Sequence, residues 1–401
     1  MMAKSLKLKL DGVAYDQWMS GEVSRDLKDF SGSFSFTFRD RDATKKVLPY
    51  ATWAPVKRIR TQMLAEIRIG KRLVLRGYVE DIDRDMSDGT AQVVISGRDQ
   101  TGDLIDCSAL VNGPAELKNV KLEDAIKKIA EPFGLSVRTE VDTGEVFERY
   151  SIDLGETAFS AIEKGARSRR VLILSDGVGG VVVTRTGVTR APDDLILPGN
   201  VIGSRGRETT QGRYSKTIVR GQSERSGKSR ATASLDSTAE PIGTDAREDG
   251  DGSATERERK GTVATGIAED GEIRRYRPIV HLARSKADAT SAQDEADWRS
   301  RTARGQSDDL THTVKGFEVK GALWTVNQLV HVSDPFQDYE RDQLISNTRY
   351  VEDSSGAVTE ITVCSPDAFD TGKVGNRRTN QRGKTGGTTS SGALDSTAEA
   401  L

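Results

Sequence analysis

Aromatic and apolar residues are scarce in this chain. Of 401 residues, 35% are hydrophobic and 5% aromatic, whereas 30% are charged and 39 are glycine. This balance disfavours a large enzyme built on one apolar core and favours β-structure with many turns. The length predicts two to four compact units.

An excess of either charge is also missing. Lys and Arg number 59 against 61 Asp and Glu, a net charge of −2, so we expect no specific binding of nucleic acid. The longest aliphatic run, Val171 to Leu174, is far shorter than the roughly 20 residues of a membrane-spanning helix, and we expect no membrane insertion. The first residues, "MMAKSLKLKLDG", lack the apolar stretch of an export signal.

Cysteine is rare too. Cys107 and Cys364 are the only two, too few for a disulfide framework. We expect two buried or partly buried free thiols, with a single long-range bridge as the alternative.

Motifs that would carry chemistry fail on their spacing. "GQSERSGKS", from Gly221 to Ser229, has five residues between its glycines where a phosphate-binding loop has four, and no apolar helix follows. Asp81, Asp83 and Asp85 imitate a calcium loop, but its sixth position is a methionine and its twelfth a glutamine. These stretches therefore predict a solvated loop and the wet face of a hairpin.

The three histidines, His281, His312 and His331, lack the spacing of a helical zinc site. Folding could bring His331 near Cys364, yet no nucleophile-elbow sequence supports a catalytic pair. The sequence predicts no catalytic, cofactor-binding or metal-binding residues, no cofactor, and a protein that is not an enzyme.

Strand patterns dominate the first hundred residues. "SLKLKL" and "SFSFTF" alternate apolar and polar residues, and further candidates end at the turn elements Gly70-Lys71 and Ser87 to Gly89. Short alternating strands at this spacing indicate a small barrel or sandwich.

The period changes near Leu110. Helical spacing predicts helices at Leu122 to Phe133 and at Thr157 to Arg167, followed by a hairpin in "VLILSDGVGGVVVTR". A compact α/β insert is expected here.

Polar residues then take over from Ser223 to Gly261, where we expect a long mobile loop, and a weakly apolar helix follows at about Ala283 to Ala303. Late strands are expected at Val314 to Val319, Leu329 to Ser333, Leu344 to Val351 and Val358 to Val363, with Tyr214 to Gln222 as a further partner. "LDSTAE" occurs at Leu235 to Glu240 and again at Leu394 to Glu399; we read it as coincidence in preference to a docking motif.

Several long strings resemble the baseplate hub proteins of contractile-tailed, Mu-type phages, a family related to T4-type hub proteins. They are "SGRDQTGDLIDCSA" at Ser96 to Ala109, "PFGLSV" at Pro132 to Val137, and the stretch from Leu323 to Phe369. In element order the resemblance covers roughly residues 4 to 370. It does not extend to Ser223 to Gly261 or to the residues after Phe369.

The resemblance implies an α+β, β-rich fold with two similar β-barrel, tube-type domains, a small α/β insert and a second peripheral helical and polar insert. The expected domains are a first barrel at 1–108, the α/β insert at 109–200, a discontinuous second barrel at 201–222 and 311–370, a polar loop plus helix at 223–310, and a disordered tail at 371–401.

The resemblance also implies a function in the virion. Three subunits would form a ring that adapts a six-fold tail tube to a three-fold spike, so the implied partners are two further copies of the chain, the tail tube protein, the central spike protein and the tape measure protein. Assembly would take place in the host cytoplasm.

Two alternatives remain open from the residues alone. The stretch from Leu110 to Arg185 could be a cell-wall glycan-binding module of a tail, although it holds only the aromatic residues Phe133, Phe147, Tyr150 and Phe159. The chain could also be a β-rich binding protein unconnected with a tail.

Overall fold

We describe the protein from a computed structural model. The structure describes residues 5–40, 58–87, 90–111, 115–222, 263–283 and 289–369. The expected polar loop at Ser223 to Gly261, both copies of "LDSTAE" and the tail after Phe369 lie outside these ranges.

The first half of a large sheet comes from the N-terminal hundred residues. Alternation places apolar side chains on one face of each strand, so that residues such as Leu8, Phe36, Ile67 and Ile95 form one fully buried core. Its strands are β1 (Leu6–Leu10), β2 (Val13–Tyr15), β3 (Ser20–Asp26), β4 (Ser33–Asp40), β5 (Leu64–Ile69), β6 (Arg72–Ser87) and β7 (Thr90–Asp99).

The second half comes from segments that are distant in the sequence. Its core lies around the buried Trp324, with Val332, Ile345 and Ile361. Its strands are β13 (Thr189–Arg190), β14 (Leu195–Ile196), β15 (Val201–Glu208), β19 (Asp308–Lys315), β22 (Gln328–Asp334), β23 (Tyr339–Asp353) and β24 (Gly356–Cys364), with a small hairpin of β20 (Glu318–Val319) and β21 (Ala322–Leu323).

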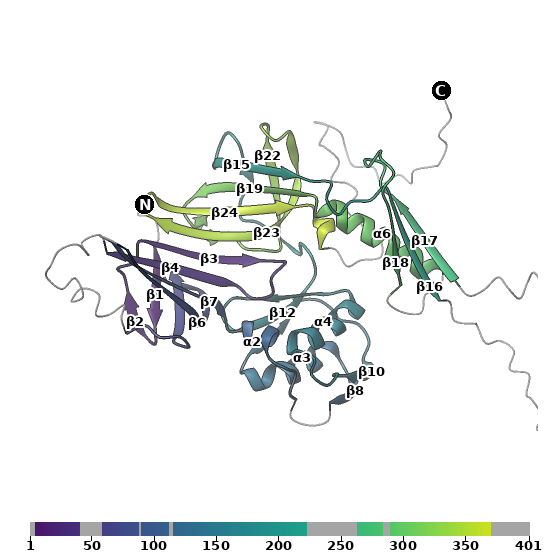
Figure 1. Cartoon of the computed structure of the whole chain (residues 1–401), viewed down its shortest axis with the longest axis horizontal. Helices are drawn as coiled ribbons and strands as arrows, with labels where there is room; N and C mark the ends of the chain where they lie inside the picture. The colour runs from purple at the N-terminus through teal and green to yellow at the C-terminus, as the bar shows by residue number, and fades with distance from the viewer. Residues whose placement is uncertain are drawn as a thin grey trace, which may run out of the picture.

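The two halves form one sheet. Among the described residues this sheet has fourteen strands, in the order β15-β19-β24-β23-β3-β4-β7-β6-β5-β1-β2 with β13, β14 and β22 attached through β22 to β23. Figure 1 shows the halves side by side, joined where β3 meets β23. The predicted β-rich fold is confirmed, but no pairing between described strands closes either half into a separate barrel. Strand β3 pairs with β4 on one edge and with β23 of the other half on its second edge.

An α/β unit packs below the sheet (Figure 1). Helix α3 (Leu122–Ala130) buries the apolar face predicted for it and ends in the 3₁₀ turn η1 (Glu131–Phe133); helix α4 (Ala158–Arg169) is capped by the Thr157 hydroxyl. Both predicted helices are present. The other elements are α2 (Gly102–Asp106), β8 (Glu116–Val120), β9 (Ser136–Thr139), β10 (Phe147–Ser151) and the predicted hairpin of β11 (Leu172–Ser175) and β12 (Gly180–Thr184).

A small peripheral unit lies at the far end of the molecule (Figure 1). Helix α6 (Ala289–Gly305) covers a sheet of β16 (Lys216–Gln222), β17 (Val263–Glu269) and β18 (Pro278–Leu282), over a core made mainly of alanine. The expected pairing of Tyr214 to Gln222 with the late strands is therefore wrong. Strand β15 pairs with β19 in its place. Strand β17 was missed because its small residues hide any alternation, and β18 because none of its five residues is fully buried.

Candidate assembly surface

The two halves of the sheet repeat one arrangement. The ladder of β6 and β7 ends at the pair Ser87 and Thr90, and that of β23 and β24 at Asp353 and Gly356. Each ladder has a register shift at the same distance from that end, between Val79 and Asp81 and between Ile345 and Asn347. Strand β4 lies against β7 as β19 lies against β24, and β3 lies against β4 as β15 lies against β19. The two halves of the sheet are therefore an internal structural repeat, although they do not share a common sequence.

A seam of main-chain pairing joins the repeats. Strands β3 and β23 are antiparallel, with register pairs running from Gly21 opposite Glu352 to Asp26 opposite Asn347. We name the distal parts of the two long strands the β23 arm (Asn347–Asp353) and the β6 arm (Asp81–Ser87). In the seam, the β23 arm pairs with β24 on one side and with β3 on the other.

Tyr350 links the cores across this seam. Its side chain is 2% exposed and packs into the first core, edge-to-face with Phe317, although it belongs to the second repeat. Its hydroxyl donates a hydrogen bond to the Trp324 carbonyl oxygen, and burial raises the pKa of Tyr350 to about 12. Separating the repeats would expose this ring to water, whereas its hydrogen bond to Trp324 lies within the second repeat.

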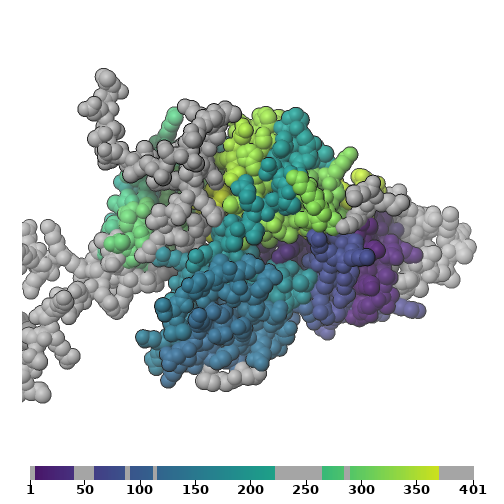
Figure 2. All heavy atoms as spheres, turned by 180° about the vertical axis from the view of Figure 1, so that it is seen from behind, coloured from purple at the N-terminus to yellow at the C-terminus, as the bar shows by residue number. Residues whose placement is uncertain are grey.

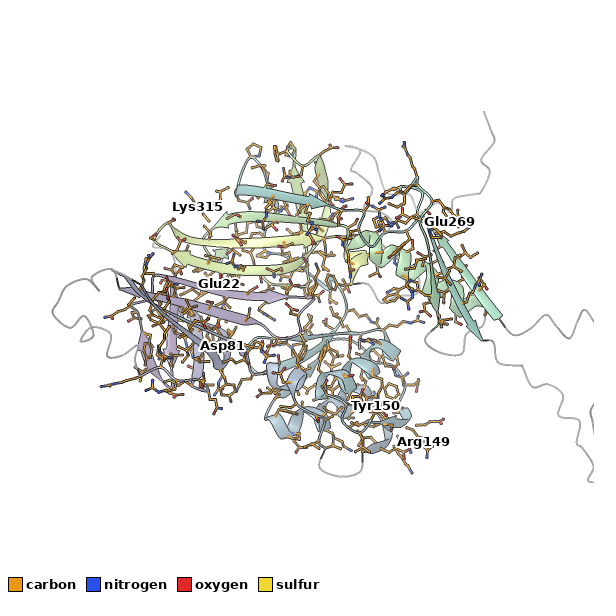
Figure 3. All side chains as sticks on the ribbon, viewed as in Figure 1. Glu22, Asp81, Arg149, Tyr150, Glu269 and Lys315 are labelled. Carbon is orange, nitrogen blue, oxygen red and sulfur yellow. The ribbon has the colours of Figure 1, made fainter. Side chains whose placement is uncertain are left out.

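Charged groups complete the outer face of the seam. Arg349 on the β23 arm donates to Glu22 on β3 and to Glu360 on β24. Burial opposes the charge on Arg349, but the two carboxylates outweigh it and raise the pKa of Arg349. Figure 3 shows Glu22 at the boundary between the halves. A pair this exposed, 40% for Arg349 and 36% for Glu22, adds specificity more than stability.

A buried carboxylate joins the sheet to the α/β unit. Asp99, 2% exposed, accepts hydrogen bonds from the Ser31 and Ser175 hydroxyls and from the Gly32 amide, at 2.8 to 2.9 Å, and from the Thr101 amide at 2.8 Å. These donors come from both units, so Asp99 holds the α/β unit against the sheet. Figure 2 shows this unit as a blue lobe below the sheet.

A cavity of about 250 Å³ lies beside this junction. Arg25, Arg138, Glu140 and Asn327 are among its lining residues, and Arg138 is paired with Glu140 at 3.0 Å. The Arg25 guanidinium donates to the Ser175 carbonyl oxygen. The charged groups of Arg25, Arg138 and Glu140 that line the cavity thus already have partners within the protein.

Ser204, Asp334 and His312 meet inside the second repeat, but not as a catalytic triad. The Ser204 hydroxyl and the His312 Nε2 atom both contact the same Asp334 oxygen, the latter at 3.0 Å, and His312 and Asp334 are fully buried. In a triad the histidine stands between serine and carboxylate and the serine is accessible. Burial lowers the pKa of His312 despite the neighbouring carboxylate.

The sites considered in the sequence are dispersed in the structure. Asp81, Asp83 and Asp85 alternate along the exposed face of β6, and no group of described His, Cys, Asp and Glu residues could hold a metal ion. His281 lies on β18, while His331 contacts Asp342 at 3.2 Å. The phosphate-loop stretch lies mostly beyond the described residues, which include only its first two positions.

Both cysteines are free thiols, as predicted, but their burial differs. Cys364 is buried, which raises its pKa to about 12, whereas Cys107 is exposed at the end of α2. The expectation that both would be at least partly buried is wrong for Cys107, because the chain leaves α2 there in an extended conformation.

The aromatic residues of the α/β unit pack inward. Tyr150 is buried and contacts Phe147 edge-to-face, and Arg169 covers the Phe147 ring at 4.1 Å. Phe159 stacks at 4.5 Å on Phe30, which lies in the segment between β3 and β4. Figure 3 shows Tyr150 inside this unit and Arg149 at its margin. These rings build a core and an interdomain contact in place of a flat platform for sugars.

Within the described ranges, no helix is long and apolar enough to cross a membrane.

Comparisons with known families follow the same division of the chain. Residues 5–99 match the Mu phage baseplate assembly protein GpP-like N-terminal family, residues 101–185 the baseplate hub protein gp44-like second domain, and residues 288–372 the Mu phage baseplate assembly protein GpP fourth domain. Baseplate hub protein gp44 of Escherichia phage Mu is 28% identical over 374 residues, 92% of this chain and 89% of that protein.

Solved structures agree. The 43 kDa tail protein of prophage MuSo2 from Shewanella oneidensis has 28% identity and a TM-score of 0.73, covering 91% of this chain and 99% of that one. The tail protein from Neisseria meningitidis MC58, at 19% identity, shares the fold with a TM-score of 0.68, covering 92% and 98%. The chain is therefore a homologue of the Mu-type baseplate hub proteins, and a baseplate and tail protein of that type.

The seam residues Glu22, Arg349 and Tyr350 were missed in the sequence. Each sits in an ordinary alternating strand, and nothing local shows that β3 and β23 meet across more than 300 positions. The similar lengths of the two long hairpins, β6–β7 and β23–β24, were the one sequence signal that could have indicated the repeat.

Proposed function

We propose that three copies of this chain form a ring that adapts the six-fold tail tube to the three-fold spike. The observation that carries the proposal is the internal repeat, since three chains with two equivalent halves each present six similar units around one axis. A ring of this kind can match six-fold symmetry on one side and three-fold symmetry on the other.

The proposed partners are the tail tube protein on one face, the central spike protein on the other and the tape measure protein along the channel. The proposed role is mechanical and involves no catalysis, cofactor or metal. The Ser204–Asp334–His312 cluster supports this reading, because His312 and Asp334 are fully buried and both the serine and the histidine contact the same carboxylate oxygen.

We also propose that the cores mark the domains of the chain. One core belongs to each sheet half, one to the α/β unit and one to the peripheral unit. The peripheral unit and α/β unit would lie outside the ring of sheets, as both pack at the margins of the sheet in Figure 1.

A glycan-binding role for the α/β unit is less well supported, because its aromatic side chains are used in packing. A pulldown with cell-wall glycan tests it directly. Retention of the isolated chain on glycan would favour that role over the adaptor.

Imaging of assembled particles with an antibody to this chain tests the adaptor function. We expect three copies between tube and spike, and light scattering of a purified ring should give about 131 kDa for three chains of 43.6 kDa. A closed ring of six chains would contradict the proposal, since twelve sheet halves could not match a six-fold tube.

A further inference from the structure

Two of the strand edges that lack a ladder partner among the described residues have a counterpart in the other repeat. Strand β15 pairs only with β19, and the β6 arm pairs only with β7. The corresponding edges in the other repeat are both paired, because β3 and the β23 arm form the internal seam. The open edge of β15 is thus the counterpart of the β3 side of the internal seam, and the open edge of the β6 arm is the counterpart of the β23 side.

We infer that β15 of one subunit pairs antiparallel with the β6 arm of the next, repeating the internal seam between chains. The partner is a second copy of this chain, and the inference rests on the proposed ring by specifying its contact. Because β15 and the β6 arm are different surfaces, the contact is heterologous and can close into a ring.

The internal repeat determines the register. Counting back from the turn, Asp83 is the counterpart of Arg349 and Asp85 that of Val351. Phe34 of β4 lies opposite Val23 of β3, and its counterpart Leu310 of β19 lies opposite Gly206 of β15. Gly206 is therefore the counterpart of Val23. It follows that Arg207 corresponds to Ser24, and Arg205 to Glu22.

Transferring the internal register places oppositely charged residues face to face. Ser24 lies opposite Arg349 and Glu22 opposite Val351 in the internal seam. Between subunits, Arg207 would therefore lie opposite Asp83, and Arg205 opposite Asp85. The diagonal ion pair of the internal seam, Arg349 with Glu22, becomes Asp83 with Arg205, with the two charges exchanged.

These side chains are available for such a contact. Asp83, Asp85, Arg205 and Arg207 are all exposed, and within the described part of the chain they form no ion pair. Charges along an open edge also discourage pairing with unrelated strands, whereas a complementary edge is attracted. The exchange of charges further disfavours β15 pairing with a β23 arm, where Arg205 and Arg207 would meet Arg349.

Cysteine crosslinking tests the register. In a Cys107→Ser background, which removes the exposed thiol, Asp83→Cys combined with Arg207→Cys should form disulfides between chains under mild oxidation, giving dimers and a closed trimer on non-reducing gels. A mixture of the two single-cysteine proteins should stop at dimers. Asp83→Cys with Glu208→Cys, one position out of register and on the opposite face, is the matched control and should remain uncrosslinked.

Charge exchange gives an independent readout. Asp83→Arg or Arg207→Asp alone should weaken association about five- to tenfold per contact, and the two together should restore it. Both measurements are made on the purified chain and on assembled particles, so that a ring formed only on the tail is also sampled.

The outcomes separate this inference from the proposed function. A three-copy ring that shows neither the crosslink nor the charge rescue would overturn the β15–β6 contact while leaving the adaptor function intact. Absence of any three-copy ring on particles would overturn both. Equal crosslinking of the control pair would also refute the proposed register.

Discussion

Truncation of Tyr350 should uncouple the two repeats of the sheet. The ring is 2% exposed and packs into the core of the opposite repeat, while its hydroxyl donates to the Trp324 carbonyl oxygen. Replacing a buried aromatic residue by alanine costs about 3–5 kcal/mol, and losing one hydrogen bond costs about 1 kcal/mol. We therefore expect Tyr350→Ala to lower the free energy of unfolding by about 3–5 kcal/mol, and Tyr350→Phe by about 1 kcal/mol.

Urea unfolding measures the total loss, and hydrogen exchange read by mass spectrometry shows where it falls. Peptides from β3 and β23 should lose protection in Tyr350→Ala, while peptides from α3 and α4 keep theirs. Tyr276→Ala, at a residue that is 93% exposed, is the matched control and should change stability by less than about 0.5 kcal/mol. Equal effects of the Tyr350 and Tyr276 truncations would refute the view that apolar burial holds the seam.

Three further predictions concern stability. Arg213→Met should lower the free energy of unfolding in urea by about 3–5 kcal/mol, because it leaves the buried Asp270 carboxylate without its cation. Glu272 is 69% exposed, so Glu272→Gln should lower it far less, and similar losses would contradict this reasoning. The pKa of His312 lies below its ordinary 6.5 in the folded chain, so acidification below about pH 6.5 protonates the unfolded chain first and the free energy of unfolding falls. His312→Gln should flatten this decrease of the unfolding free energy with falling pH, and an unchanged decrease would argue against the role of His312. Gly266→Val should displace α6, since even a Cβ atom there would lie 2.1 Å from the Ala292 carbonyl oxygen, whereas a Cβ atom at Gly271 meets nothing within 4 Å. Thermal unfolding should therefore give a lower melting temperature for Gly266→Val than for Gly271→Ala. Equal melting temperatures would exclude the close contact.

Local patterns were sufficient for much of the fold. Alternation in "SLKLKL" and "SFSFTF" identified strands because one face of each is buried, and the spacing of Leu122, Ile126 and Ile129 identified α3 for the same reason. The peripheral strands β17 and β18 escaped detection. In β17, alanine and glycine bury little apolar area and leave no clear period, and none of the five residues of β18 is fully buried. The long strings at Ser96 to Ala109 and after Leu323 were specific enough to indicate the family.

The sequence by itself determined which segments become strands and helices, and through its long specific strings the family of hub proteins. Only the tertiary structure decided which strand edges meet, because backbone hydrogen bonds carry no sequence signature and β3 pairs with a strand more than 300 residues away. The same structure left one edge of β15 and one edge of the β6 arm without a ladder partner among the described residues. Arg207 and Asp83 are ordinary charges on wet strand faces in the sequence, and only the register of the internal seam, transferred to the inferred contact between subunits, would set them opposite each other.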